Sequence, residues 1–345
     1  MSTALTLPGG GDVLVDDVLP QVLPPREGRR RVAVLTQPGA SDIADRVVRR
    51  ADRPVDVRVL PDRDAAKTPE VLADVWAWFA DIGLGRGDTV VGVGGGAVTD
   101  LAGFAAATWM RGVEVVHVPT TLLAAVDAAI GGKTGINVAG KNLVGSFWQP
   151  ARVAIDVSVL ETLPAHLRRE GMAEALKVGY LADAELQAMV ARDGLGAPLR
   201  EVVERAVAVK VAVVAEDERE AGRRAILNYG HTIGHAIERL AAVSHGEAVA
   251  VGMVAAAAVG ARRTGFEPSD EHRSTLEFVG LPIAVGGIDP EEVLQLVGLD
   301  KKRTAEGIRM VLHEAYPRPG LEVGDHAAGR AGLPADRPEA RPPDV

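Results

Sequence analysis

Between residues 31 and 119 the sequence alternates short runs of β-branched residues with segments of helical pattern. The runs typical of strands are RVAVLT (31–36), VDVRVL (55–60), DTVVGV (88–93) and VEVVHVP (113–119). Segments 41–51 and 69–82, which lie between them, have the composition and spacing of helices. Apolar strands separated by helices of this length predict a parallel sheet built from βαβ units.

After about residue 160 the strand signal almost disappears. Segments such as HLRREGMAEALKVGYL and EAVAVGMVAAAAVGARRTG have apolar residues at helical spacing. A chain of 345 residues also favours two domains over one. We therefore predict an α/β domain over residues 1–158 and an all-α domain over residues 159–330. Residues 331–345, rich in Pro, Ala and charge, are predicted to form a flexible tail.

Composition excludes several classes of protein. The net charge of −9 argues against a general nucleic-acid binder. The absence of cysteine excludes disulfides and thiolate metal sites, and it suits a reducing cytoplasm. The first twenty residues lack the features of a signal peptide, and the most apolar stretch, 248–261, is too short to span a bilayer. We expect a cytoplasmic protein that binds neither nucleic acid nor membrane.

Glycines cluster where the third strand meets a helix, in VVGVGGGAVTDLAGFAAA. Gly94, Gly95 and Gly96 would let a ligand approach the unpaired N–H groups of the helix start, which favour phosphate. A tight turn that binds nothing would give the same pattern. The match to G-x-G-x-x-A is weak alone and follows the third strand rather than the first. The loop is therefore more typical of a phosphate or nucleotide site than of an ordinary dinucleotide fold.

Three of the eight histidines lie close together in LNYGHTIGHAIERLAAVSHGEAV. His231 and His235 are four residues apart and would share a helix face, which a solvated surface could also explain. The flanking residues, however, are small and apolar, and a buried imidazole needs a partner for each nitrogen. With His245 nearby, and Glu174 as an oxygen ligand, the pattern favours a zinc site that keeps one position open for substrate.

Isolated charges occur in otherwise apolar or glycine-rich segments. Such charges are costly to bury unless they are paired or bind a ligand. A solvated loop with incidental lysines remains an alternative for residues 119–150. The isolated polar residues of these segments are Asp127, Lys133, Lys141, Asn142, Glu174, Lys177, Lys210, Arg224 and Asn228.

Taken together, these motifs resemble those of the 3-dehydroquinate synthase family, which belongs to the sugar-phosphate cyclases. The matching segments run in order from about residue 88 to about residue 312: GGGAVTDLAGFAAATWMRGV, HVPTTLLAAVDAAIGGKTGIN, GKNLVGSFWQP, GMAEALKVG, LNYGHTIGHAIE, HGEAVAVGM and LDKKR. The resemblance implies an N-terminal NAD-binding α/β domain, a C-terminal helical domain that binds metal and substrate, and a homodimer.

The resemblance also implies roles for individual residues. The metal, Zn²⁺ or Co²⁺, would be held by Glu174, His231 and His245. Catalytic roles would fall to Asp127, Lys133, Lys177, Lys210, Asn228 and His235. Substrate would be bound by Arg111, Lys141, Asn142, Arg224, Lys301 and Lys302, with Arg111 at the phosphate. NAD would be bound by Asp64, Lys67, Gly94, Gly95, Gly96, Asp100, Thr120 and Thr121.

The activity implied is conversion of 3-deoxy-D-arabino-heptulosonate 7-phosphate to 3-dehydroquinate and phosphate, in the shikimate pathway. It would proceed by transient oxidation with NAD, elimination of phosphate and aldol cyclisation. Three departures from the family pattern stand out. The interval 137–141 is shortened, and the interval 235–245 is shortened and lacks the usual aromatic residue before His245. The N-terminal strand region is abbreviated, with Asp64 in place of the usual glutamate. The alternatives are a sister cyclase of the amino-dehydroquinate, valiolone or inosose type, a metal-dependent alcohol dehydrogenase, and a non-catalytic binding protein.

Overall fold

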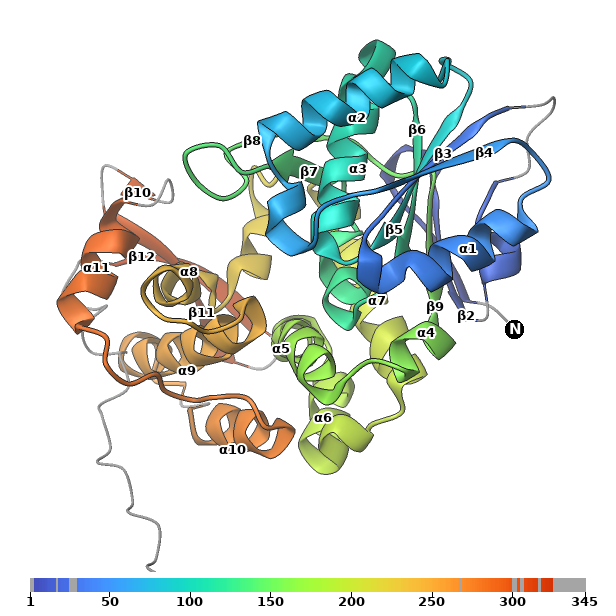
Figure 1. Cartoon of the computed structure of the whole chain (residues 1–345). Coiled ribbons are helices and arrows are strands. Elements are labelled where there is room, and N and C mark those ends of the chain that lie inside the picture. Colours follow the sequence, from blue (N-terminus) through green and yellow to red (C-terminus); the bar gives the residue numbers. More distant parts are fainter. Residues whose placement is uncertain are drawn as a thin grey trace, which may run out of the picture. The chain divides into compact units, whose positions relative to one another are not determined.

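The computed structural model describes residues 3–16, 18–24, 30–266, 269–299, 303–304, 307–315 and 318–324. The chain divides into two compact units, each built from two segments. The first unit comprises Met1–Ala175 and Gly196–Arg224, and the second comprises Leu176–Leu195 and Ala225–Val345. Figure 1 shows the elements coloured along the sequence.

The first unit contains a sheet with the order β1-β2-β9-β6-β5-β3-β4 among the described residues. Its strands are β1 (Thr3–Thr6), β2 (Asp12–Asp16), β3 (Val32–Thr36), β4 (Val55–Val59), β5 (Thr89–Gly94), β6 (Glu114–Pro119) and β9 (Arg152–Asp156). β1 is antiparallel to β2, and every other neighbouring pair is parallel. The four strands expected from the sequence are β3, β4, β5 and β6, so the predicted parallel sheet is confirmed.

Helices cover both faces of this sheet (Figure 1). The helices of the first unit are α1 (Ser41–Arg50), α2 (Pro69–Asp81), α3 (Gly96–Thr108), α4 (Val157–Glu161) and α7 (Leu199–Glu216). Along β3, Ala33 and Leu35 face a core shared with α2 and α3, whereas Val32 and Val34 face a core shared with α1. Successive side chains of a strand point to opposite faces, which explains why these strands read as continuous apolar runs.

Two further elements carry site residues. A two-stranded antiparallel hairpin is formed by β7 (Lys133–Ile136) and β8 (Val144–Phe147), and its connecting loop contains residues 137–143. Helix α5 (Ala165–Ala182) begins in the first unit and ends in the second. The hairpin was not predicted, because its glycine-rich strands lack apolar periodicity.

The second unit is mostly helical. Its helices are α6 (Ala184–Asp193), α8 (His231–Leu240), α9 (His245–Thr264), α10 (Ser269–Val279) and α11 (Pro290–Leu299). Ile233 and Ile237 of α8 pack with Ala248 and Val251 of α9 in one buried cluster. The predicted fold class, an α/β part followed by a helical part, is confirmed.

The second unit also contains a small antiparallel sheet that the sequence pattern did not predict. Its strands are β10 (Arg303–Thr304), β11 (Gly307–Ala315) and β12 (Arg318–Gly324). The domain limits predicted at residues 158 and 330 were set by changes in the sequence pattern. The two units, in contrast, are defined by which parts of the folded chain pack together, and each combines two separate stretches. Those limits stay a prediction, and the predicted tail, 331–345, lies outside the described residues.

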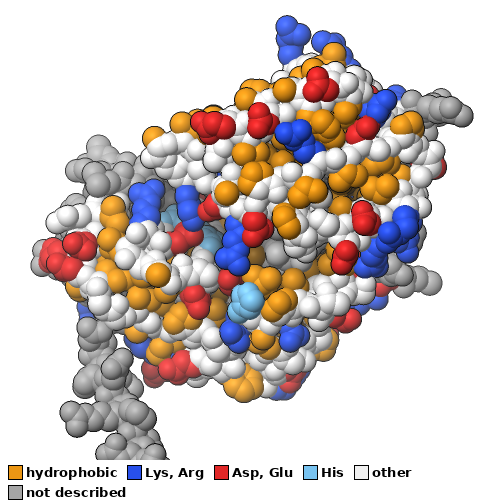
Figure 2. Space-filling model, viewed as in Figure 1, with side chains coloured by type: hydrophobic (Ala, Val, Ile, Leu, Met, Phe, Trp, Pro, Cys, Tyr) orange, Lys and Arg blue, Asp and Glu red, His pale blue; other side chains and the backbone are white. Residues whose placement is uncertain are grey.

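Acidic and basic side chains are interspersed on the face drawn in Figure 2, consistent with a modest net charge of −9. In the part of the chain that the structure describes, no helix combines the length and apolar character needed to cross a membrane.

Candidate active site

The glycine turn joins β5 to α3 at the carboxyl edge of the parallel sheet. β5 ends at Gly94, Gly95 is the N-cap residue, and α3 begins at Gly96. A Cβ atom on Gly94 would lie 2.5 Å from Cγ2 of Val98, so only glycine lets the helix pack this close to the strand. The first N–H groups of α3 have no partner within the helix. This geometry fits an anion such as the pyrophosphate of a dinucleotide.

Two threonines border this turn at the end of the neighbouring strand. The N–H of Thr120 donates to the carbonyl of Gly94 at 2.9 Å, and Oγ1 of Thr121 accepts from the N–H of Ala124 at 3.2 Å. Since β5 and β6 are parallel neighbours, their carboxyl ends meet at one edge. Ligands of open α/β sheets bind at this edge. The structure therefore brings together Gly94, Gly95, Gly96, Thr120 and Thr121.

Lys67 is the centre of a second group in the first unit. Its Nζ donates to Oδ2 of Asp100 on α3 at 2.5 Å and to Oδ1 of Asn142 in the β7–β8 loop. Burial raises the pKa of the Asp100 carboxyl above its ordinary value, and the Lys67 ammonium opposes that rise. Nearby, Nζ of Lys141 lies 3.6 Å from Oδ2 of Asp64, and both side chains are exposed. Residues predicted for NAD and for substrate thus meet at one ammonium group.

Lys210 and Asp127 form a buried ion pair. Nζ of Lys210, on α7, donates to the backbone carbonyl of Asp127 at 2.7 Å and to its carboxylate. Asp127 belongs to a short π-helical segment, Ala124–Ala128, a geometry that is frequent at functional sites. The pair explains how an isolated lysine is tolerated in an apolar helix.

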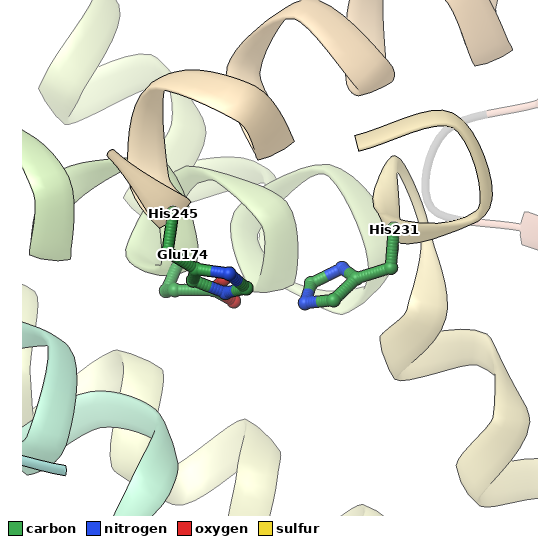
Figure 3. A group of neighbouring side chains, drawn as sticks. All are labelled: Glu174, His231 and His245. Atoms are coloured by element: carbon green, nitrogen blue, oxygen red, sulfur yellow. The ribbon is translucent and has the colours of Figure 1, made fainter. Parts of the chain in front are cut away.

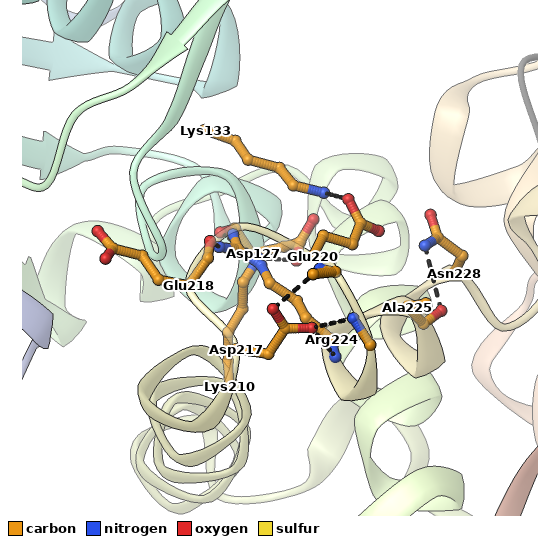
Figure 4. A network of polar contacts seen from close by, with 11 residues as sticks. Asp127, Lys133, Lys210, Asp217, Glu218, Glu220, Arg224, Ala225 and Asn228 are labelled. Atoms are coloured by element: carbon orange, nitrogen blue, oxygen red, sulfur yellow. Dashed lines mark hydrogen bonds and ion pairs between the residues drawn. The ribbon is translucent and has the colours of Figure 1, made fainter.

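Arg224, labelled in Figure 4, is buried and lies beside Gly131 in the same unit. A Cβ on Gly131 would lie 2.4 Å from Nη2 of Arg224, and the φ of Gly131 is +97°. The guanidinium donates to the carbonyl of Glu218, and Asp217 accepts the backbone N–H of Arg224 at 3.0 Å. Burial lowers the pKa of Arg224, while the carboxylate of Glu220 acts in the opposite direction. The arrangement holds a buried cation against a glycine backbone.

Lys133 forms an ion pair with Glu220, which the sequence did not single out (Figure 4). Glu220 lies in a left-handed backbone conformation with φ of 58°. Asp217 shapes this segment by accepting the N–H groups of Ala221 and Gly222, which also lowers the pKa of Asp217. In the sequence, Glu220 is one of several charged residues in AEDERE that look like the solvated end of a helix. No sequence signal therefore identifies it as the partner of Lys133.

The remaining predicted residues occupy varied positions. Lys177 is buried on α5, and Nδ2 of Asn228 donates to the carbonyl of Ala225 at 3.1 Å (Figure 4). Arg111 is exposed on the turn Trp109–Arg111 with φ of 68°. Lys301 and Lys302 lie outside the described residues.

Glu174, His231 and His245 form a group that could hold a metal ion. One ligand atom from each of the three side chains lies within 4.8 Å of the other two. Figure 3 shows the imidazole of His231 directed toward the other two side chains. Glu174 comes from α5, while His231 and His245 are the first residues of α8 and α9. Ser244 and Glu247 form a reciprocal capping box that fixes the start of α9 and with it the backbone of His245.

The hydrogen bonds of the two imidazoles fit metal binding. Nδ1 of His231 contacts the backbone carbonyl of Tyr229 at 3.1 Å, and Nδ1 of His245 contacts Oε2 of Glu238 at 3.4 Å. Because these oxygens only accept, each Nδ1 carries the proton and Nε2 keeps the lone pair that a metal needs. The nitrogen and carboxylate donors suit Zn²⁺ or Co²⁺. Glu238 was not identified from the sequence.

His235 differs from the other two histidines. Its ring centroid lies 5.2 Å from that of His231 and 6.1 Å from that of His245. Among the residues that the structure describes, it is not a member of the group with metal-ligand spacing. Its side chain is half-buried, and the predicted contact with substrate stays a prediction.

Comparisons with known proteins place the chain by sequence and by structure. Residues 57–170 match the family model "3-dehydroquinate synthase N-terminal", and residues 171–303 match "3-dehydroquinate synthase C-terminal". A 3-dehydroquinate synthase from Mycolicibacterium vanbaalenii is 46% identical over 91% of this chain and 90% of its own length.

Two solved structures are similar to the whole chain. One is 2-deoxy-scyllo-inosose synthase complexed with carbaglucose-6-phosphate, NAD⁺ and Co²⁺; the match has a TM-score of 0.86 and 26% identity, covering 96% of this chain and 98% of that one. The other is 2-epi-5-epi-valiolone synthase from Streptomyces hygroscopicus with NAD⁺ and Zn²⁺ bound; its TM-score is 0.85 at 25% identity, covering 94% and 95%.

The fold, with its glycine turn and its Glu-His-His group, defines a protein of the sugar-phosphate cyclase class. Within that class the sequence matches are more specific, since both family models adjoin and together cover most of the chain. The chain belongs to the 3-dehydroquinate synthase family.

Proposed function

We propose that this protein is an enzyme that converts 3-deoxy-D-arabino-heptulosonate 7-phosphate to 3-dehydroquinate and phosphate. The observation that carries the proposal is the grouping of Glu174, His231 and His245 in a chain of this family. The reaction is a carbon–oxygen lyase reaction followed by ring closure, and it belongs to aromatic amino acid biosynthesis through the shikimate pathway.

Bound NAD and a divalent metal supply the transient oxidation of a substrate hydroxyl and the polarisation of its oxygen. Glu174, His231 and His245 would hold the metal. The glycine turn with Asp100, Thr120 and Thr121 would hold NAD, with Asp64 and Lys67 near its ribose.

The ion pair of Lys210 and Asp127 supplies a positioned carboxylate. The Lys210 ammonium fixes the Asp127 side chain, so that its carboxylate can face the reacting sugar carbons. His235 is half-buried beside the metal group and can both donate and accept a proton as a neutral imidazole. Lys177 and Asn228 complete the proposed catalytic set.

The anionic groups of the substrate would be held by basic residues. Lys133 and Arg224 are neighbours of the same glycine segment, and each can bind phosphate or carboxylate. Glu220 pairs with Lys133 in the described structure, so the substrate anion must compete with that carboxylate. Lys141, Asn142, Lys301 and Lys302 are the further proposed substrate contacts.

The assembly and location of the enzyme belong to the same proposal. A homodimer, the usual state of the family, would allow the exposed Arg111 to reach the phosphate in the partner subunit's site. A cytoplasmic location is supported by the absence of cysteine. Sedimentation equilibrium of the pure protein tests the dimer, and a monomer at micromolar concentration would contradict it.

The substrate is tested by phosphate release. Metal-loaded enzyme with NAD⁺ is incubated separately with the heptulosonate phosphate, with sedoheptulose 7-phosphate and with glucose 6-phosphate. We expect turnover of the first alone. Turnover of sedoheptulose 7-phosphate or glucose 6-phosphate, with none of the heptulosonate, would instead identify a sister cyclase.

The reaction class is tested by absorbance of the nicotinamide ring during turnover. A cyclase returns its hydride to the substrate, so phosphate should accumulate while NADH stays below the enzyme concentration. A metal-dependent alcohol dehydrogenase would produce NADH in proportion to product.

A further inference from the structure

Lys67 contacts the β7–β8 loop at both ends of the segment 137–142. Its backbone carbonyl accepts the N–H of Asn137 at 2.8 Å, and its ammonium donates to the side chain of Asn142. Within the loop, the N–H of Asn142 donates to Oδ1 of Asn137 at 3.0 Å. One residue therefore closes the segment 137–142 from its first residue to its last.

The closed segment holds a backbone that residues with a Cβ atom disfavour. Ala139 has φ of 55° and Asn142 has φ of 54°, both in the left-handed region. Such conformations persist where surrounding contacts hold them. Asn142 itself is exposed; the Lys67 ammonium holds its side chain, and the side chain of Asn137 holds its backbone N–H.

The same ammonium reaches the dinucleotide side of the site. Its second partner, Asp100, lies on α3, the helix that starts at the glycine turn. Only 6% of the Lys67 side chain and 17% of the Asp100 side chain are exposed, so this ion pair is largely shielded from bulk solvent, where such a pair is strong. Lys67 thus links one element proposed to bind NAD with another proposed to bind the sugar phosphate.

We propose that Lys67 is a positioning residue that couples NAD binding to binding of the substrate's anionic group, through its bridge from Asp100 to Asn142. The inference rests on the proposed function. Whichever ligand binds first fixes the Lys67 side chain and the loop, so that the second ligand meets a segment already ordered. Coupling of this kind is reciprocal, and each ligand raises the affinity for the other by the same factor.

An exposed cation close to Lys67 in the sequence provides a matched control. Nε of Arg63, on the turn Arg63–Ala66, lies 3.9 Å from Oδ2 of Asp62, and their side chains are 85% and 65% exposed. Exposed pairs contribute little because solvent screens them. Arg63→Met therefore removes one positive charge, as Lys67→Met does, from a residue outside the proposed site, and it leaves the Lys67 bridge in place.

The test measures affinities by titration calorimetry on the full-length, metal-loaded protein. The dissociation constant of NAD⁺ is determined without phosphate and with saturating inorganic phosphate. The dissociation constant of phosphate is then determined without NAD⁺ and with saturating NAD⁺. For the unchanged protein we expect each ligand to tighten the other about tenfold, within the range usual for coupled sites. In Lys67→Met the ratio should fall to one, and in Arg63→Met it should stay near tenfold.

A second variant guards against misfolding of Lys67→Met, which leaves Asp100 buried without its cation. Asn142→Ala keeps the bond between Lys67 and Asp100, so NAD⁺ affinity without phosphate should stay unchanged while the tenfold coupling is lost. If Lys67 only supports the fold, Lys67→Met should weaken NAD⁺ binding, but Asn142→Ala should keep the tenfold coupling. Coupling retained in Asn142→Ala would therefore overturn the inference.

The two levels of proposal fail differently. If the unchanged protein does not bind NAD⁺, the proposed function is wrong. If NAD⁺ and phosphate both bind but neither alters the affinity for the other, the function stands and the role of Lys67 is wrong.

Discussion

At the scale of single residues, ionisable groups in this chain are held by partners distant in sequence. Lys210 pairs with Asp127, 83 residues away, and Lys67 pairs with Asp100, 33 residues away. The sequence could indicate that an isolated lysine needs a partner, because an unpaired buried charge is costly. It could not name the partner, since that depends on how remote segments fold together. Glu220 was missed for the same reason, since it lies 87 residues from Lys133. Glu238 was missed although it lies only seven residues from His245.

The three histidines should differ in their effect on metal content. His231→Ala and His245→Ala each remove a proposed ligand, so both should lower bound metal and activity together. His235→Ala should lower activity while metal stays near one equivalent. Elemental analysis of the purified variants measures this. A His235 variant without metal, beside a His245 variant that keeps it, would contradict the assignment.

His117 should make stability depend on pH. It is buried on β6, its Nδ1 has no hydrogen-bond partner among the described residues, and burial lowers its pKa from 6.5 to about 4. Protonation therefore favours the unfolded chain, and stability that is complete above pH 6.5 is lost as the pH falls toward 4. The loss should be on the order of 3 kcal/mol, at about 1.4 kcal/mol for each pH unit.

Urea denaturation at pH 7 and at pH 4.5 measures that loss. His117→Leu should flatten the dependence, whereas replacing the exposed His166 by Ala should leave it as in the unchanged protein. Equal slopes for His117→Leu and the unchanged protein would show that other groups cause the acid sensitivity.

At the scale of elements, alternation with helices decided what the sequence could predict. The apolar runs that form β3, β4, β5 and β6 alternate with segments of helical pattern, and this alternation identifies them as strands. Strands β2 and β9 have five residues each, as many as β3 and β4, so their length does not explain why they were missed. β1 and β2 precede the first α-helix, and β9 follows the β7–β8 hairpin, so these three strands lie outside the alternating pattern. The sheet of β10 to β12 follows a long helical region, so its strands were overlooked. The metal group was predictable because two of its members start adjacent helices in one motif.

The capping box of α9 should support both stability and metal binding. Ser244 accepts the N–H of Glu247, and the Glu247 carboxylate accepts the N–H of Ser244 at 2.8 Å. Ser244→Ala should lower the free energy of unfolding by about 1 kcal/mol. It should also weaken metal binding, since His245 is the first residue of the helix.

Chemical denaturation of the metal-free protein and a competitive metal titration provide the two measurements. Ser274→Ala, at an exposed position within α10, is the matched control and should change stability by less than about 0.5 kcal/mol. An effect of Ser244→Ala no larger than this control would mean that the cap does not support α9.

At the scale of the whole molecule, metal binding should be linked to stability. The proposed ligands come from three helices, and the ion can bind all three only when the chain is folded. Saturating metal at a hundred times its dissociation constant should add about 2.7 kcal/mol. Differential scanning fluorimetry should show a lower Tm after EDTA treatment and recovery with Zn²⁺ or Co²⁺. His231→Ala should show no such response, and a Tm indifferent to EDTA in the unchanged, metal-loaded protein would argue against a bound ion.

Each compact unit is assembled from two separated stretches of chain, and this bears on synthesis at the ribosome. When residues 1–175 have emerged, α7 has not yet been translated, although it packs against β1 and β2 in the same unit. The first unit is complete only after residue 224 has been synthesised. At that point residues 176–195 of the second unit are present, but the rest of that unit, from residue 225 onward, has not been synthesised. Neither unit is formed by one continuous stretch of the chain. A gene fragment cut at residue 175 would therefore encode every strand of the seven-stranded sheet but lack α7, the helix that packs against β1 and β2, so the first unit can complete its fold only late in synthesis.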